Sequence, residues 1–244
     1  MSQYKLIVSN WKMNLNFVEA KKLLQKIIQI KSEKSKVKHI VCPQFLLIPF
    51  VSNLIKNDKI EIGAQDCHFK KKGAFTGDNS IELIKKSSCK YVIVGHSERR
   101  EYHKETNEII RQKVDIIISE RIKPILCIGE SLNHRKARKY KQVLKEQLKK
   151  CIPEKLSEII IAYEPIWSIG TGMTPRIEEI LEVQYFIKKF LIEFKKIPKI
   201  KFLYGGSVNS NNFNQIINNS DIDGALIGGA SLKIKEMKKI LTFC

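Results

Sequence analysis

The sequence predicts an α/β fold in which eight parallel strands close into a (β/α)8 barrel enclosed by helices. Short, β-branched apolar runs alternate with longer amphipathic segments along the chain, and this alternation is typical of a parallel sheet with right-handed crossovers. The apolar runs are nearly continuous, as expected of parallel strands that are covered on both faces. Eight such units within 244 residues match a closed barrel in number and length. We therefore expect residues 1–244 to form a single domain.

Each strand segment leaves room for a helix or loop before the next one. In chain order the predicted strands are Leu6–Ser9, Val37–Cys42, Ile60–Ala64, Tyr91–Val94, Ile122–Ile128, Ile159–Tyr163, Lys201–Tyr204 and Gly224–Ile227. Two intervening segments have apolar residues at helical spacing. One stripe contains Phe17, Ala20, Leu24, Ile27 and Ile28, and the other contains Ile177, Ile180, Leu181, Gln184, Ile187, Leu191 and Phe194. Pro175 and Pro198 are expected to limit the second helix.

The alternative fold is an open, doubly wound sheet. Such sheets usually have a glycine-rich phosphate-binding turn after the first strand. Here the first strand runs into Ser9-Asn10-Trp11-Lys12 instead, so the closed barrel is preferred.

The composition excludes several classes of protein. A hydrophobic content of 43% argues against intrinsic disorder, and no uninterrupted apolar stretch of about 18 residues predicts a membrane span. The amino terminus lacks a secretory pattern, and the six cysteines include no C-x-x-C pair. We expect a cytoplasmic protein with reduced thiols and with neither a metal site nor a cofactor.

The net charge of +19 raises the alternative of a nucleic-acid-binding protein. However, the cations are 37 Lys and 7 Arg, whereas phosphate and base recognition favours the bidentate guanidinium group. The lysines are also scattered in ones and twos, with Lys70–Lys72 as the longest run. We interpret most of them as the solvated faces of helices and expect no specific nucleic-acid partner.

Polar residues and glycine turns follow five of the predicted strands. The carboxyl ends of barrel strands share one face, which is where function gathers. In chain order these residues are Asn10 and Lys12, then His96 and Glu98, then Glu164, then Gly205-Gly206-Ser207, and finally Gly228-Gly229. The set has no metal-ligand spacing and no Ser or Cys nucleophile paired with a base. It indicates proton-transfer chemistry on a small anion.

Five motifs resemble those of the triosephosphate isomerase family, in the same order and at the same spacing. They are S-N-W-K-M-N (residues 9–14), G-H-S-E-R-R (95–100), A-Y-E-P-I-W-S-I-G-T-G (162–172), Y-G-G-S-V (204–208) and G-G-A-S-L (228–232). The resemblance covers essentially the whole chain. It implies a TIM barrel and an isomerase of glycolysis and gluconeogenesis. Its reaction would interconvert dihydroxyacetone phosphate and D-glyceraldehyde 3-phosphate through an enediolate.

The resemblance also implies roles for individual residues. Glu164 matches the family's base, which moves a proton between adjacent carbons, and His96 matches the electrophile that stabilises the enediolate oxygen. The helix that begins after His96 would favour the neutral imidazole. Lys12 matches the family's cationic group, and Asn10 would position Lys12 and the substrate. Glu98 is a supporting candidate, with pairing to Lys12 or capping of a helix as the alternative.

Further positions match the family's phosphate site, lid and dimer contact. Gly170, Ser207, Gly228 and Gly229 fall on the phosphate-binding positions, and residues 165–172 resemble the lid that excludes water. The loop Gly73–Asp78 resembles the segment that reaches the neighbouring active site. It implies a homodimer in which Thr76 lies near the partner's Asn10 and Lys12, and a solvated loop is the alternative.

The chain departs from the family's usual residues at a few positions. Asp78 stands where Glu is usual, Ser168 where Ala is usual in the lid, and Lys104 where Gly is usual; Met173–Arg176 differs from the commoner second hinge. None of these is a predicted catalytic residue. Two other functions stay open at this point: a basic binding module with a relict site, and a different phosphate-binding barrel enzyme.

Overall fold

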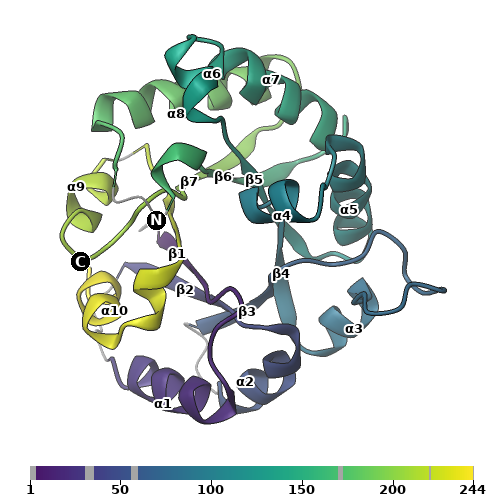
Figure 1. Ribbon diagram of the computed structural model, residues 1–244, viewed down its shortest axis with the longest axis vertical. Helices are drawn as coiled ribbons and strands as arrows, with labels where there is room; N and C mark the ends of the chain where they lie inside the picture. The colour runs from purple at the N-terminus through teal and green to yellow at the C-terminus, as the bar shows by residue number, and fades with distance from the viewer. Residues whose placement is uncertain (1–3, 31–35, 56–59, 170–172, 220, 244) are drawn as a thin grey trace.

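The computed structural model describes residues 4–30, 36–55, 60–169, 173–219 and 221–243. It confirms the closed barrel, in which all eight strands are parallel and neighbours in sequence are neighbours in space (Figure 1). The strands are β1 (Lys5–Asn10), β2 (Val37–Cys42), β3 (Ile60–Ala64), β4 (Cys89–Val94), β5 (Lys123–Ile128), β6 (Glu158–Tyr163), β7 (Lys199–Tyr204) and β8 (Gly224–Ile227). The open doubly wound alternative is therefore wrong.

The barrel closes where β1 pairs with β8 and Leu6 lies beside Gly224. A Cβ atom at position 224 would lie 1.9 Å from the Leu6 carbonyl oxygen, so only glycine permits this approach. Along each strand the side chains alternate between two apolar layers. Leu6, Val8, Ile40, Ile93 and Leu203 belong to the cluster inside the barrel, and the second, larger cluster packs between strands and helices.

Helices surround the barrel on its outside (Figure 1). They are α1 (Phe17–Ile28), α2 (Ile48–Leu54), α3 (Ile81–Lys86), α4 (Ser97–Tyr102), α5 (Asn107–Ser119), α6 (Leu132–Lys136), α7 (Tyr140–Cys151), α8 (Ile177–Glu193), α9 (Phe213–Ile217) and α10 (Ile234–Leu241). Three short 3-10 turns are η1 (Phe45–Leu47), η2 (Ile166–Ser168) and η3 (Gly229–Leu232). Among the described residues, no helix combines the length and apolar character needed to cross a membrane.

The two predicted helical stripes are confirmed except at their ends. Asn16 caps α1 by accepting a hydrogen bond from Glu19 N, and the Glu19 side chain accepts one from Asn16 N. Phe17 and Phe194 are exposed rather than buried. Phe17 is the first residue of its helix and Phe194 follows the last residue of α8. At these ends neither side chain lies on the helix face that packs against the barrel.

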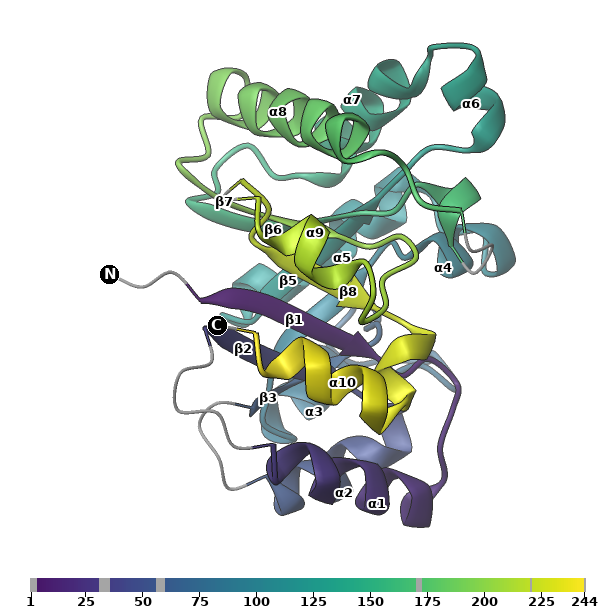
Figure 2. The same cartoon turned by 90° about the vertical axis from the view of Figure 1, so that its left-hand side faces the viewer.

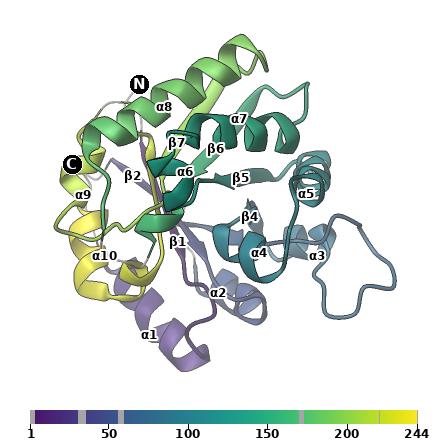
Figure 3. The same ribbon diagram turned by 45° about the horizontal axis from the view of Figure 1, so that its top comes forward.

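The parallel strands give the molecule two different ends. Figure 2 shows β1 from the side, with its carboxyl end on the right. The loops that follow the strands gather at this end. The segment between β3 and α3 extends away from the barrel, beside α3 in Figure 3.

Candidate active site

Asn10 and Lys12 lie at the carboxyl end of β1. Asn10 is buried, and its Oδ1 accepts a hydrogen bond of 3.0 Å from Lys12 N. Lys12 has a φ angle of 52°, a left-handed conformation that is disfavoured for a side-chain-bearing residue. Its Nζ lies 2.5 Å from Glu98 Oε1. Asn10 thus contacts the Lys12 backbone, and Glu98 pairs with the Lys12 side chain, a contact that the sequence offered as the alternative role of Glu98.

His96 is the N-cap residue of α4 and is buried. Its Nδ1 accepts a hydrogen bond of 3.2 Å from Glu98 N, while the Glu98 carboxylate is 3.6 Å from the same nitrogen and beyond hydrogen-bonding range. A nitrogen that accepts an amide proton carries none itself, so the ring proton belongs on Nε2. His96 Nε2–H faces Glu164, whose Oε1 is 3.2 Å away.

Glu164 follows β6 and is only 2% exposed. Its Oε2 accepts a hydrogen bond of 3.0 Å from Ser97 N at the first turn of α4, where an anion is favoured. The backbone at Gly129 approaches Glu164 so closely that only glycine fits there, and Gly205 is also tightly packed against it. A Cβ at Gly129 would lie 1.7 Å from the Glu164 carbonyl oxygen, and one at Gly205 would lie 3.0 Å from Glu164 Cγ.

One cavity of about 380 Å³ brings most of the predicted residues together. Its lining includes Asn10, Lys12, His96, Glu164, Ser207, Gly228 and Gly229. Glu98 lies beside it through its ion pair with Lys12. Gly170 lies outside the described residues. Thr76 is exposed on the loop between β3 and α3, so a single copy of the chain does not bring it to the cavity.

The loops after β7 and β8 form another part of the cavity wall. Gly228 lies so close to Lys12 that an added Cβ would be 3.3 Å from Lys12 Cε. Gly229 begins η3, and the first amides of a helical turn lack partners within it. The Ser207 hydroxyl donates a hydrogen bond of 2.5 Å to the Ser168 carbonyl oxygen. This wall therefore places helical-turn amides beside a lysine, which is an arrangement suited to an anion.

Gln65 and Cys127 complete the site, although the sequence reasoning did not select them. Gln65 Nε2 donates to the carbonyl oxygens of Lys12, at 2.8 Å, and of Cys42, at 2.9 Å. Burial and, next, the Glu164 carboxylate raise the pKa of the Cys127 thiol well above its ordinary value, so the thiol stays protonated beside Glu164. Gln65 follows β3 directly, and a search of that strand end would have found it.

A buried carboxylate anchors the segment that follows Glu164. Glu130 Oε1 accepts hydrogen bonds from Tyr163 OH at 3.0 Å and from Trp167 Nε1 at 3.2 Å. Burial raises the pKa of Glu130, and the hydrogen bonds from Trp167 and Tyr163 oppose this shift. The backbone of Glu130 also accepts a hydrogen bond from Ile166 N. Like Gln65, Glu130 follows a strand end that was not searched.

Ser168 connects the expected lid to residues outside it. Its buried hydroxyl donates a hydrogen bond of 2.6 Å to the Met173 carbonyl oxygen and lies 3.2 Å from Tyr204 OH. The alanine that is usual at this position has no hydroxyl, so these contacts are specific to the serine. Residues 170–172 of the expected lid lie outside the described residues.

The site combines a buried carboxylate, an imidazole, an ammonium group and glycine turns around a small cavity. This set can remove a proton from a carbon atom, stabilise a neighbouring oxyanion and hold an anionic group. Across the part of the chain that the structure describes, no three His, Cys, Asp or Glu side chains are grouped closely enough to hold a metal ion.

Comparison with known proteins agrees with this geometry. The family model for triosephosphate isomerase matches residues 5–244. Curated triosephosphate isomerases from Alkaliphilus oremlandii and Endomicrobium trichonymphae are 41% and 38% identical to this chain, and in both cases 98% of each chain is covered. The enzyme from Dictyoglomus thermophilum is 38% identical, covering 94% of this chain and 95% of its own. This chain therefore belongs to the triosephosphate isomerase family.

Proposed function

We propose that this chain interconverts dihydroxyacetone phosphate and D-glyceraldehyde 3-phosphate in the cavity at the carboxyl ends of the strands, with Glu164 as the base. The isomerase activity and its place in glycolysis follow from the family. The observation that supports the assignment of the base is the buried Glu164 carboxylate, 3.2 Å from His96 Nε2, in a cavity that Lys12 also lines.

The reaction moves one proton between two adjacent carbon atoms and another between the oxygens that they carry. Glu164 removes a proton from the hydroxyl-bearing carbon beside the substrate carbonyl, and the electron pair moves to the carbonyl oxygen to give an enediolate. The hydroxyl proton of the first carbon then moves to this oxyanion, and the protonated Glu164 delivers its proton to the carbon that had carried the carbonyl. This leaves a carbonyl on the first carbon and a hydroxyl on the second. The atoms balance without an oxidant or reductant, so the residues of this chain supply all the groups that the proposal uses.

His96 and Lys12 stabilise the negative charge that develops on oxygen. The Nε2–H of His96 is available to donate to the enediolate, because Nδ1 already accepts the Glu98 amide proton. Lys12 attracts the phosphate group and the oxyanion, and Asn10 holds the Lys12 backbone in place. Glu98 acts through Lys12 as a positioning residue.

The phosphate group binds at the part of the wall that the loops after β7 and β8 form, through Ser207, Gly228 and Gly229. Support comes from the helical turn that begins at Gly229 and from the closeness of Gly228 to Lys12. Gly170 belongs to the same proposal through the family resemblance. Closure of residues 165–172 over the substrate would exclude water and prevent loss of phosphate from the enediolate.

A coupled assay with glyceraldehyde 3-phosphate tests the mechanism. Glu164→Gln keeps the size of the side chain but removes the base, so we expect turnover to fall by about 10²- to 10⁴-fold. Glu193→Gln, an exposed substitution at the end of α8, serves as the control and should keep normal turnover. Absence of turnover in the unmodified chain, or normal turnover in Glu164→Gln, would refute the assignment.

We also propose that two copies form a homodimer through the Gly73–Asp78 loop. Met13, Leu46 and Phe75 are 88%, 84% and 40% exposed. They follow β1, β2 and β3, which are neighbours in the barrel, and exposed apolar groups on adjacent loops favour a protein interface. In this assembly Thr76 would approach the partner's Asn10 and Lys12.

Sedimentation of Thr76→Arg tests the dimer. An arginine at this position would face the partner's ammonium group, so we expect dissociation and loss of activity at concentrations where the unmodified chain is dimeric. Gln25→Arg adds the same charge on an exposed position of α1 and should leave the dimer intact. A monomeric unmodified chain at micromolar concentration would contradict the proposal.

We further propose that residues 1–244 form one domain located in the cytoplasm. The match of one family model to residues 5–244 supports a single domain. The described cysteines Cys42, Cys67, Cys89, Cys127 and Cys151 are all buried and free, which is compatible with a reducing compartment.

A further inference from the structure

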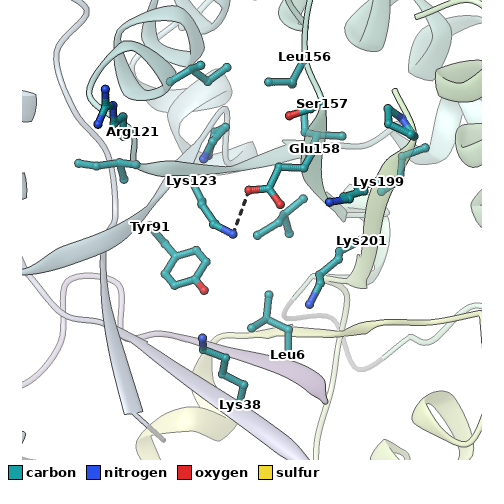
Figure 4. Close-up of a pocket in the computed structure, with 17 residues that line it drawn as sticks. Leu6, Lys38, Tyr91, Arg121, Lys123, Leu156, Ser157, Glu158, Lys199 and Lys201 are labelled. Atoms are coloured by element: carbon teal, nitrogen blue, oxygen red, sulfur yellow. Dashed lines mark ion pairs between the residues drawn. The ribbon is translucent and has the colours of Figure 1, made fainter. Parts of the chain in front are cut away.

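A cavity larger than the one at the proposed active site lies at the amino ends of the strands. It has a volume of about 700 Å³, compared with about 380 Å³ at the carboxyl ends. Figure 4 shows the side chains that line it, drawn from strands around the barrel. We call it the basal cavity and define it by Lys38, Lys123, Glu158, Lys199 and Lys201.

The lysines of the basal cavity belong to the strands, not to helix surfaces. On β7 the side chains alternate, and Lys199 and Lys201 share the register of Leu203, which packs inside the barrel. Lys38 shares the register of Ile40 in the same way on β2. Lys199 and Lys201 are exposed at this open end of the barrel, and β7 becomes buried only from Phe202. Their ammonium groups are therefore accessible to a ligand in the basal cavity.

Positive charge is in excess within the basal cavity. The lining residues include five cations, because Arg121 joins the four lysines, and a single carboxylate, Glu158. Lys123 Nζ pairs with Glu158 Oε1 at 2.9 Å. Within the described ranges, the side chains of Lys199 and Lys201 form no ion pair. Figure 4 shows them pointing toward the space that Lys38 also faces.

The nearest buried carboxylate does not neutralise this excess. Glu61 Oε2 lies 2.7 Å from Lys38 Nζ, and its Oε1 lies 2.7 Å from Lys90 Nζ. Tyr91 OH donates a further hydrogen bond of 2.8 Å to Glu61. Two ammonium groups thus share one carboxylate, and the group as a whole keeps a positive charge.

The floor of the basal cavity is apolar. Leu6 and Ile160 line it and belong to the cluster inside the barrel, while Pro124 and Ile159 add to the wall. A concave surface with an apolar floor and converging charged groups is the usual form of a small-molecule site. The ammonium groups select an anion, and their number favours a ligand with several negative charges.

We propose that the basal cavity binds a small molecule that carries two or more phosphate groups. Lys38, Lys199 and Lys201 contact the phosphate oxygens, and Lys123 contributes from its pair with Glu158. Inorganic triphosphate and a nucleoside triphosphate share this chemistry, and the nucleoside would add contacts with Leu6 and Ile160. The site is separate from the proposed isomerase site. Lys123, Glu158 and Lys199 of the basal cavity are the first residues of β5, β6 and β7, whereas Glu164 and Gly205 of the other cavity follow the ends of β6 and β7.

Calorimetric titration of the full chain with inorganic triphosphate and with ATP, in about 100 mM salt, tests the proposal. We expect one triphosphate per chain and an affinity that falls at least about tenfold in the double variant Lys199→Gln/Lys201→Gln. Lys12→Gln, which changes the other cavity, should leave this affinity unchanged. If ATP binds more tightly than triphosphate, the nucleoside contacts the apolar floor of the cavity. If the two bind equally, only the phosphate groups are recognised.

A control variant separates a site from the general charge of the chain. Lys21→Gln/Lys22→Gln removes two exposed lysines from α1, and it should bind triphosphate like the unmodified chain. Both double variants should retain isomerase activity, which shows that they are folded. Equal losses of affinity in the two variants would overturn the proposal, as would binding that depends on Lys12. A short single-stranded RNA that binds more tightly than triphosphate and depends on Lys199 and Lys201 would overturn it in favour of a nucleic-acid surface.

Discussion

Lys12 shows how a disfavoured backbone conformation is maintained in the proposed active site. Its φ angle of 52° costs of order 1–3 kcal/mol for a non-glycine residue. Asn10 Oδ1 accepts its amide proton, and Gln65 Nε2 donates to its carbonyl oxygen. The conformation directs the side chain toward Glu98, across the face of Gly228. The backbone partners thus fix the ammonium group beside the cavity before any substrate binds.

His39 provides a prediction about acid stability. Burial lowers the pKa of its imidazole to about 3, from an ordinary value of 6.5, and its Nε2 lies 2.8 Å from Ser9 Oγ. Between these pH values the unfolded chain binds a proton that the folded chain does not, so the free energy of unfolding falls as pH decreases from 6.5. We expect this residue alone to remove about 2 kcal/mol between pH 7 and pH 5.

Urea unfolding of His39→Gln at the two pH values measures this contribution. The variant should lose less stability between pH 7 and pH 5 than the unmodified chain does, by the same 2 kcal/mol or so. His103→Gln changes an exposed histidine and should behave like the unmodified chain. Parallel acid sensitivity in His39→Gln and in the unmodified chain would show that His39 does not cause it.

At the scale of elements, a buried ion cluster connects α5 to the segment after β3. Lys113 Nζ lies within 2.8 Å of both Asp66 carboxylate oxygens and 2.6 Å from Glu105 Oε1. Arg99 contacts the same two carboxylates. All of these charges are largely withdrawn from water, and the desolvation outweighs the lysine's effect on Asp66, whose pKa is raised.

Removal of one member of this cluster should destabilise the fold strongly. Lys113→Met leaves two buried carboxylates with one cation, and we expect the free energy of unfolding to fall by about 3–5 kcal/mol. Lys141→Met breaks an exposed pair with Glu182 and should cost less than about 1 kcal/mol. Urea unfolding at neutral pH compares the two variants. Similar losses in both would indicate that burial of the cluster adds nothing to its contribution.

The elements differ in how well the sequence predicts them. Strands such as β2 and β3 were predicted at their observed bounds, because apolar and β-branched residues predominate in them in spite of Lys38, His39 and Glu61. The first two residues of β7, Lys199 and Ile200, were missed, because Pro198 and the charged Lys199 precede the apolar run. Short helices such as α9 gave no clear period. The Lys113 cluster could not be predicted either, since its partners are 8 and 47 residues away.

The predicted site residues depended on motifs more than on periodicity. Asn10, His96 and Glu164 were predicted because they follow strand ends. They lie together in one cavity of the structure, because parallel strands end on the same face. Gln65 and Glu130 were missed, although they follow strands in the same way, because the ends of β3 and β5 were not searched. The predicted role of Thr76 requires two chains, and the geometry of one chain does not test it.

At the scale of the whole molecule, the net charge of +19 divides into parts with different roles. Lysine pairs such as Lys85-Lys86 and Lys149-Lys150 are exposed on helices, as the charge pattern predicted. Others, at the amino ends of the strands, line the basal cavity. Lys12 lies at the carboxyl ends. All of them add to the long-range field around the molecule, whatever their local contacts are.

This field should accelerate the encounter with an anionic substrate and make it sensitive to salt. Exposed charges act over about 30 Å at 0.01 M ionic strength but only about 10 Å at 0.1 M. We therefore expect kcat/KM for glyceraldehyde 3-phosphate to fall several-fold between these conditions, through attraction of the phosphate dianion. Uncharged glyceraldehyde should show no such fall. The variant Lys21→Gln/Lys22→Gln/Lys149→Gln/Lys150→Gln lowers the net charge by four on exposed helix positions and should reduce the salt dependence without changing kcat. An unchanged salt dependence in this variant would instead assign the attraction to Lys12 and its neighbours in the active site.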